Sequence, residues 1–318
     1  MGVLSKAKIK IAFVGLGGVG GYYGGLVSHY AEKDPDIAVC FVARGEHLKA
    51  IREHGLKVSD EKQSFITRPT IATDKVEDIG KVDYIVLATK SYDLDATMQQ
   101  IKPMVSPDTI LLPLLNGIDN TSRLRTFFPE NEVWYGCVYI ITRLIRPGVI
   151  LDSGNVHFMH FGHEKKVSKQ LLYIEDLFLK SGIEVTRKEE PVKAIWRKFF
   201  YISTTAALTT YLNTDFRSLV WDEDKKPLYL DIMRELYALS EAEGVGLYEG
   251  IIDDMLKYGG SLPAGSTSSM NSDYLAGRRT EIETLIGVVV RLGQKHSIPT
   301  PVYSAIYHQL MQGVGKNE

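Results

Sequence analysis

Three glycines near the start of the chain have the spacing of a phosphate-binding loop. Gly15, Gly17 and Gly20 follow an apolar run, residues 9–14, which is typical of a buried parallel strand, and they precede a stretch that can form a helix. In this pattern the glycines allow a tight turn, close approach of the backbone to a pyrophosphate, and close packing of helix on strand. Backbone N–H groups and the helix dipole then face the phosphates. The alternative is a glycine turn without a ligand, but its place between strand and helix favours a dinucleotide site that includes Leu16, Gly18 and Val19.

An arginine stands where this kind of site selects between cofactors. Residues 37–43 are expected to form the second parallel strand, and Arg44 follows that strand directly. NAD-binding units place an Asp or Glu there to bind the ribose 2′-hydroxyl. A guanidinium instead suits a 2′-phosphate in charge and in bidentate geometry, so NADP is favoured over NAD. The alternative is a solvated arginine in a turn.

Two further polar residues follow predicted strands. Lys90 comes shortly after the strand predicted for residues 82–88, and Asn116 follows the strand predicted for residues 109–115. Because the carboxyl ends of strands carry the ligand site in open α/β sheets, both side chains are placed to meet the cofactor or substrate. An exposed loop lysine and a plain Asn-Gly turn are the alternatives.

The second half of the chain offers a lysine, a glutamate and a serine. Lys198 lies at the margin of the apolar stripe of a helix predicted for residues 191–211, where a lysine with its ammonium in solvent is common. Glu281 falls in the first turn of another predicted helix, and the helix dipole alone would explain an acid there. Ser269, with Ser268, is a plausible helix cap. These residue types alone do not establish a catalytic site.

A run of histidines does not indicate a metal site. His157, His160 and His163 are three residues apart on a predicted strand. Because such positions alternate between the two faces of a strand, the three imidazoles cannot converge on one ion.

The pattern of predicted elements divides the chain into two domains. Short strand-like runs alternate with helices as far as residues 183–187, and 3.6-residue periodicity dominates from Pro191 onward. We therefore predict an α/β fold, with a Rossmann-type doubly wound sheet in residues 1–189 and an all-helical domain in residues 190–318.

Composition excludes several classes of protein. The 318 residues include 37 basic and 39 acidic side chains, so the net charge of −2 gives no support to nucleic-acid binding. The two cysteines, Cys40 and Cys137, lie far apart in apolar runs, as expected for buried thiols in a reducing compartment. No apolar segment is long enough to cross a membrane, so we expect a cytoplasmic protein.

The combination of motifs resembles the ketopantoate reductase (2-dehydropantoate 2-reductase) family. The matching residues run in order along nearly the whole chain: G-L-G-G-V-G, Arg44, Lys90, Asn116-Gly117, W-R-K at residues 196–198, and S-S-M followed by R-R-T-E-I.

The resemblance implies a function and a set of roles. It implies NADPH-dependent reduction of 2-dehydropantoate to pantoate, a step of pantothenate biosynthesis. Because the cofactor carries the difficult step, we expect that no metal ion is required. Lys198 matches the general acid of the family, and Glu281 matches the acid that binds substrate and orients this lysine. Ser269 matches a residue that contacts substrate, and Asn116 and Lys90 match residues that line the cofactor and substrate site. It also implies a helical C-terminal domain and, frequently, a homodimer.

Two residues depart from the family pattern. Asparagines usually stand four and eight residues after the catalytic lysine, whereas this chain has Ile202 and Ala206. Losing two amides from a site built to hydrogen-bond polar groups changes discrimination strongly. Two alternatives are therefore kept: reduction of another small 2-oxo acid, and a non-catalytic NADP-binding sensor.

Overall fold

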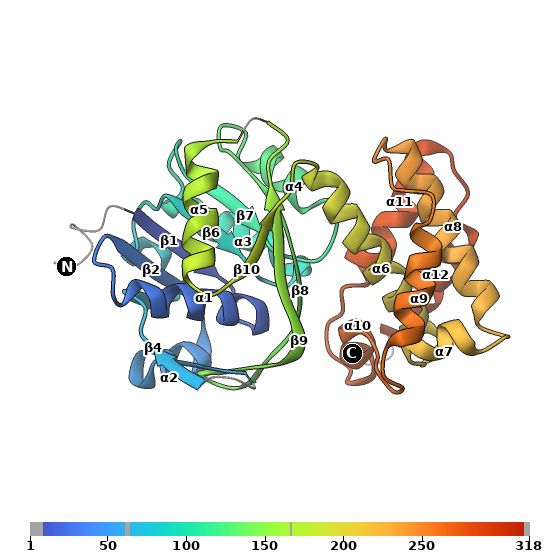
Figure 1. The fold of residues 1–318 in the computed structure, drawn as a ribbon, viewed down its shortest axis with the longest axis horizontal. Helices are drawn as coiled ribbons and strands as arrows, with labels where there is room; N and C mark the ends of the chain where they lie inside the picture. The colour runs from blue at the N-terminus through green and yellow to red at the C-terminus, as the bar shows by residue number, and fades with distance from the viewer. Residues whose placement is uncertain (1–8, 61–63, 166, 315–318) are drawn as a thin grey trace. The chain divides into compact units, whose positions relative to one another are not determined.

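The computed structural model describes residues 9–60, 64–165 and 167–314. These residues form two compact units (Figure 1). The N-terminal unit contains the described residues up to Leu115 together with Asp119–Pro191. The helical unit contains Asn116–Ile118 together with the described residues from Val192 onward. A three-residue segment from the first half of the chain therefore belongs to the second unit.

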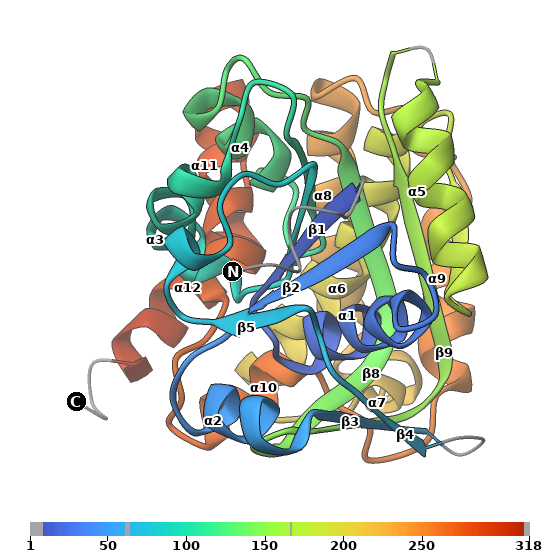
Figure 2. The ribbon, with the colours of Figure 1, turned by 90° about the vertical axis from the view of Figure 1, so that its left-hand side faces the viewer.

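The first sheet of the N-terminal unit has five parallel strands in the order β5-β2-β1-β6-β7. Figure 2 shows β5, β2 and β1 side by side. From the central β1 the chain adds strands on one side and then returns to add β6 and β7 on the other. This reversal is the topological switch point at which open α/β sheets bind ligands. The strands are β1 (Ile9–Val14), β2 (Ile37–Val42), β5 (Ile71–Thr73), β6 (Tyr84–Leu87) and β7 (Ile110–Pro113).

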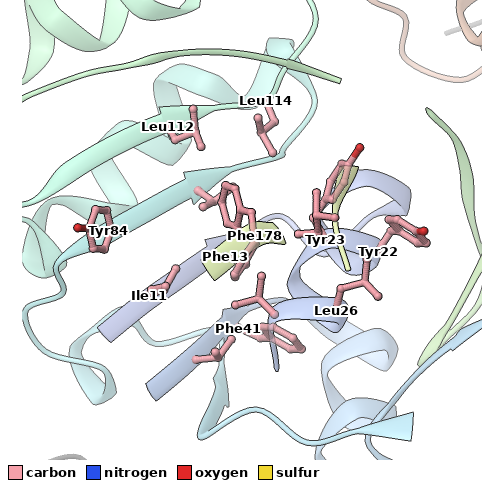
Figure 3. Close-up of a cluster of buried hydrophobic side chains, with 14 of the residues drawn as sticks. Ile11, Phe13, Tyr22, Tyr23, Leu26, Phe41, Tyr84, Leu112, Leu114 and Phe178 are labelled. Atoms are coloured by element: carbon pink, nitrogen blue, oxygen red, sulfur yellow. The ribbon is translucent and has the colours of Figure 1, made fainter. Parts of the chain in front are cut away.

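Both faces of this sheet are covered, which explains why its strands are apolar at most positions, with Lys10 of β1 and Thr73 of β5 as exceptions. Phe13 and Phe41 point to one face and meet edge to face, 6.3 Å between ring centroids. Figure 3 shows them with Leu26 of helix α1 (Gly18–Ala31) in one hydrophobic cluster. Val14 and the alternate residues of the other strands form a second cluster on the opposite face. Helix α1 approaches the sheet closely because it is rich in glycine: a Cβ at Gly24 would lie 3.0 Å from the ring of Phe13.

A second sheet completes the N-terminal unit. Its order is β10-β9-β3-β4, and β8 pairs with β9 as a long antiparallel hairpin. The strands are β3 (Leu56–Ser59), β4 (Ser64–Thr67), β8 (Tyr135–Arg146), β9 (Val149–Gly162) and β10 (Glu184–Arg187). The remaining elements are α2 (Gly45–His54), α3 (Leu94–Ile101), α4 (Asn120–Phe127), α5 (Lys169–Lys180) and the 3₁₀ turns η1 (Val76–Asp78), η2 (Ser91–Asp93) and η3 (Lys102–Met104).

Helices make up the regular structure of the described part of the second unit. They are α6 (Pro191–Leu212), α7 (Phe216–Trp221), α8 (Lys226–Ala242), α9 (Ile251–Ser261), α10 (Ser269–Leu275), the π-helical turn η4 (Glu283–Gly287), α11 (Val288–His296) and α12 (Pro301–Val314). They pack around a single core that includes Phe199, Tyr229 and Leu236. The predicted fold class, a Rossmann-type parallel sheet followed by a helical C-terminal region, is confirmed. None of the helices in the described residues combines the length and the apolar composition that a bilayer crossing needs.

Candidate active site

The glycine-rich loop joins β1 to α1, and each of its three spaced glycines has a different environment. Gly15 has φ +88°, and a Cβ there would lie 2.7 Å from the backbone nitrogen of Thr89. A Cβ at Gly20 would lie 2.0 Å from the carbonyl oxygen of Gly15. Gly17 differs, because a Cβ there would meet nothing within 4 Å. Turn geometry and packing therefore require the first and third glycines, whereas open space lies beside the second.

The start of α1 has the electrostatic character of an anion site. Gly17 is the N-cap, and the Gly21 amide donates to its carbonyl oxygen at 2.8 Å, so the amides of Gly18, Val19 and Gly20 precede the first helical bond. No acidic residue lies in the first turn of this helix. The N-terminus of this 14-residue helix therefore fits a pyrophosphate, because it carries no acid and begins beside Gly17.

Arg44 and Lys90 follow β2 and β6, the two strands that flank β1 in the first sheet. Arg44 is the N-cap of α2, its side chain is 90% exposed, and its Nη2 is 3.8 Å from Oδ2 of Asp93. Lys90 is exposed and precedes the η2 turn that ends at Asp93. An exposed guanidinium at the carboxyl end of β2 can receive a 2′-phosphate. The residues present therefore fit the 2′-phosphate of NADP in addition to the pyrophosphate that NAD and NADP share.

A histidine that the sequence analysis did not single out contacts this loop. His47 Nε2 is 2.8 Å from the carbonyl oxygen of Leu16, and the backbone amide of Gly148 donates to His47 Nδ1 at 2.9 Å. Burial lowers the pKa of His47 below its usual range. These contacts could not be predicted from the sequence around His47, because Leu16 and Gly148 are 31 and 101 residues away.

In the helical unit, Lys198, Asn116 and Glu281 form one hydrogen-bonded group. Lys198 Nζ donates to Asn116 Oδ1 at 2.9 Å, and Asn116 Nδ2 donates to Glu281 Oε2 at 3.3 Å. Lys198 is only 9% exposed and Glu281 only 4%, so the solvated lysine considered as an alternative is excluded. The amide bridges an ammonium and a carboxylate that are both removed from bulk water, where electrostatic interactions are strong.

Helix α6 and the turn before α11 hold these charged groups. Lys198 is on α6, in a stretch of sequence in which Trp196, Phe199 and Phe200 are also buried. The Glu281 carbonyl accepts the first helical hydrogen bonds, from the amides of Thr284 and Leu285, so Glu281 lies at the junction rather than inside the first turn. Here the helix widens into the π-helical turn η4, a feature found frequently at functional sites.

Ser203 and Tyr303 support the widened turn. Ser203 Oγ donates to the Leu285 carbonyl at 2.6 Å and lies 2.8 Å from the Tyr303 hydroxyl. Ser203 and Tyr303 are fully buried, and Leu285 is 1% exposed. Hydrogen bonds at Ser203, five residues after Lys198 on α6, therefore connect this helix to η4 and α12.

Ser269, the other residue predicted to contact substrate, is exposed, unlike Lys198 and Glu281. Ser269 is the exposed first residue of α10, whereas Ser268 is the N-cap and accepts from the Asn271 amide at 3.1 Å. The hydrogen bonds that join Asn116, Lys198 and Glu281 do not include Ser269.

The departures from the family pattern lie on the same helix as the lysine. Ile202 is half-buried, and Ala206 is fully buried in the helical core.

In the part of the chain that the structure describes, no group of three or more His, Cys, Asp or Glu side chains is arranged so that it could hold a metal ion. The ring of His157 instead lies between two carboxylates, with Nδ1 3.6 Å from Oδ2 of Asp152 and Nε2 3.8 Å from Oε1 of Glu184.

Comparison with known proteins relates these features to one family. Residues 11–165 match the model of the ketopantoate reductase PanE/ApbA family, and residues 192–313 match the model of its C-terminal domain. A crystal structure of 2-dehydropantoate 2-reductase from Porphyromonas gingivalis W83 is 33% identical, with a TM-score of 0.85 over 95% of this chain and 99% of that one.

Two curated relatives are similar over nearly their whole length. The uncharacterized oxidoreductase YkpB of Bacillus subtilis is 25% identical over 95% of this chain and 98% of its own. A 2-dehydropantoate 2-reductase of Mesorhizobium japonicum is 26% identical over 94% of this chain and 95% of its own.

Proposed function

The chain belongs to the ketopantoate reductase PanE/ApbA family, and from this premise we propose that it is an NADPH-dependent 2-dehydropantoate 2-reductase that forms pantoate in pantothenate biosynthesis. Members of this family are oxidoreductases that use a pyridine nucleotide. The observation that carries the proposal is the buried group formed by Lys198, Asn116 and Glu281. A buried ammonium is costly to maintain without partners, and a buried charge held by hydrogen bonds is typical of a catalytic site.

The chain's own residues supply acid catalysis and charge stabilisation. NADPH, when bound, supplies the hydride that adds to the carbonyl carbon of the 2-oxo acid. Negative charge then develops on the carbonyl oxygen, and the Lys198 ammonium donates a hydrogen bond to it and finally transfers a proton, which gives the alcohol. Lys198 regains its proton from water. Asn116 accepts a hydrogen bond from the ammonium and so fixes its direction, and the Glu281 carboxylate in turn holds the Asn116 amide.

The residues that would hold the cofactor are those around the glycine loop. The amides at the start of α1 would bind the pyrophosphate beside Gly17, and Arg44 would bind the 2′-phosphate. We expect Arg44→Ala to raise the Kd for NADPH by about tenfold to a hundredfold, the loss of one or two charge-assisted hydrogen bonds, and to leave the Kd for NADH nearly unchanged. Equal effects on both nucleotides would refute this role for Arg44.

Replacement of the lysine tests the catalytic part of the proposal. Lys198→Ala should lower kcat by at least about a hundredfold, the range for loss of one acid catalyst, with little change in NADPH affinity. Lys198→Met keeps the apolar stem and controls for lost packing. Arg197→Ala is the matched control, because Arg197 is the neighbouring cation on α6 and is exposed. Near-normal turnover in Lys198→Met would remove Lys198 from the mechanism.

A second candidate function is reduction of another small 2-oxo acid. Ile202 and Ala206 motivate it, because the apolar side chains stand where the family usually has amides that hold polar groups of the substrate. A panel of 2-oxo acids, with NADPH and with NADH, distinguishes the two by kcat/KM. If NADPH binds stoichiometrically and no 2-oxo acid is reduced, the protein is instead a non-catalytic sensor. The cytoplasmic location and the homodimer stay predictions.

A further inference from the structure

One side chain links three separate segments of the N-terminal unit. His47 lies on α2, three residues after Arg44. Its Nε2 is 2.8 Å from the Leu16 carbonyl oxygen in the glycine loop, and its Nδ1 is 2.9 Å from the Gly148 amide in the turn between β8 and β9. Gly148 has φ +75°, so the amide is presented by a turn that favours glycine.

These contacts define the protonation state of the ring. The Gly148 backbone N–H can only donate, so Nδ1 must be the acceptor and carry no proton. The Leu16 carbonyl can only accept, so Nε2 must carry the proton. His47 is therefore the neutral Nε2–H tautomer, and both of its ring nitrogens are used.

The bond to Leu16 determines the direction of a peptide group in the loop. The Leu16 carbonyl and the Gly17 N–H belong to one planar trans peptide and point to opposite sides of it. A carbonyl held toward His47 therefore directs the Gly17 N–H away from His47. Gly17 is the N-cap of α1 and is the loop glycine with open space beside it.

We propose that His47 is a positioning residue for the dinucleotide: by holding the Leu16 carbonyl it presets the loop peptide that faces the pyrophosphate, without touching the nucleotide. This inference rests on the proposed function, since it assumes a dinucleotide at the loop. It differs from the role of Arg44, which acts on the 2′-phosphate. Loss of the His47 contact should weaken NADPH and NADH by similar factors, because both carry the pyrophosphate.

Two conservative variants separate the two hydrogen bonds. In His47→Asn the amide oxygen can replace Nδ1 and keep the Gly148 bond, but the shorter side chain cannot reach Leu16. In His47→Gln the amide nitrogen can reach the position of Nε2 and keep the Leu16 bond. His54→Ala is the matched control, because His54 is on the same helix and its side chain is 78% exposed.

The test is direct titration of each protein with NADPH and with NADH, followed by nucleotide fluorescence, beside thermal unfolding of the nucleotide-free protein. We expect His47→Asn to raise both Kd values about tenfold, the effect of one orienting hydrogen bond, and His47→Gln to stay within about threefold of the parent. His54→Ala should change neither.

The inference is overturned if His47→Asn binds both nucleotides as well as His47→Gln does, or if its Kd rises for NADPH alone. A merely structural role would lower the melting temperature of His47→Asn and leave both Kd values unchanged, which also overturns it. If the parent protein binds neither nucleotide, the proposed function fails, and the inference fails with it.

Discussion

The hydroxyl of Ser203 offers a quantitative test of how the helical unit is held together. Ser203 donates to the Leu285 carbonyl at 2.6 Å, so the Tyr303 hydroxyl must donate to Ser203 at 2.8 Å. All three groups are buried, and water cannot readily replace a lost partner. Ser203→Ala leaves both the Leu285 carbonyl and the Tyr303 hydroxyl without this partner.

The magnitudes follow from the number of polar groups that lose a partner. Each buried group costs about 1–3 kcal/mol, so we expect Ser203→Ala to lower the free energy of unfolding by about 3 kcal/mol. Tyr303→Phe keeps the Ser203 to Leu285 bond and should cost about 1 kcal/mol. The double variant leaves only the carbonyl unsatisfied, so it should cost about 1–2 kcal/mol less than the two single variants together.

Urea denaturation measures these differences. Two of the three tryptophans, Trp196 and Trp221, lie in the helical unit, so tryptophan fluorescence reports chiefly on its unfolding. The matched control is Ser240→Ala: Ser240 is also fully buried, but its hydroxyl donates to the Tyr237 carbonyl in its own helix. This variant should cost less than about 1 kcal/mol, because a local bond of this kind adds little to a helix. Additive effects of Ser203→Ala and Tyr303→Phe, or equal costs for the two serines, would refute the reasoning.

Three other outcomes are expected. Gly20→Ala should destabilise the protein by about 3 kcal/mol or more and abolish nucleotide binding, because its Cβ would lie 2.0 Å from the Gly15 carbonyl; thermal unfolding and NADPH titration check this. Asn116→Ala should lower kcat about tenfold to a hundredfold at unchanged NADPH affinity, because the ammonium and carboxylate lose charge-assisted hydrogen bonds; an unchanged kcat would contradict it. Hydrogen bonds from Arg125, at 2.8 and 2.9 Å, lower the pKa of Glu164 to about 2. After allowance for solvent screening, Glu164→Gln should therefore cost about 1 kcal/mol at pH 7, and the difference should shrink as the pH falls below 4.5 toward 2; a difference independent of pH would count against it.

The local parts of the fold could be predicted from the sequence. The run at residues 9–14, the glycines after it and the periodicity of α6 each carry a signal within about twenty residues. The hairpin is harder to predict. Strand β8 extends to Arg146, but Ile141 and Ile145 near its end are exposed, so the sequence there lacks the alternation that indicates a half-buried strand. Helix α4 was not predicted.

Long-range contacts limited what the sequence could say of the site. Asn116 is 82 residues from Lys198 and 165 from Glu281, and no local pattern indicates that one amide bridges both. An Asn-Gly turn and a first-turn acid each had an adequate local explanation. The roles of these residues came from the family resemblance, and they stay predictions until the variants are measured.

The segment Asn116–Ile118 has a consequence for how this protein can be divided. Because these residues cluster with the helical unit while the chain on both sides belongs to the other unit, the polypeptide passes between the units three times. A fragment beginning at Val192 would carry Lys198 and Glu281 but lack the amide between them. The helical half is therefore not a self-contained module, and a gene fusion or split placed near Pro191 would separate the ammonium from the group that orients it.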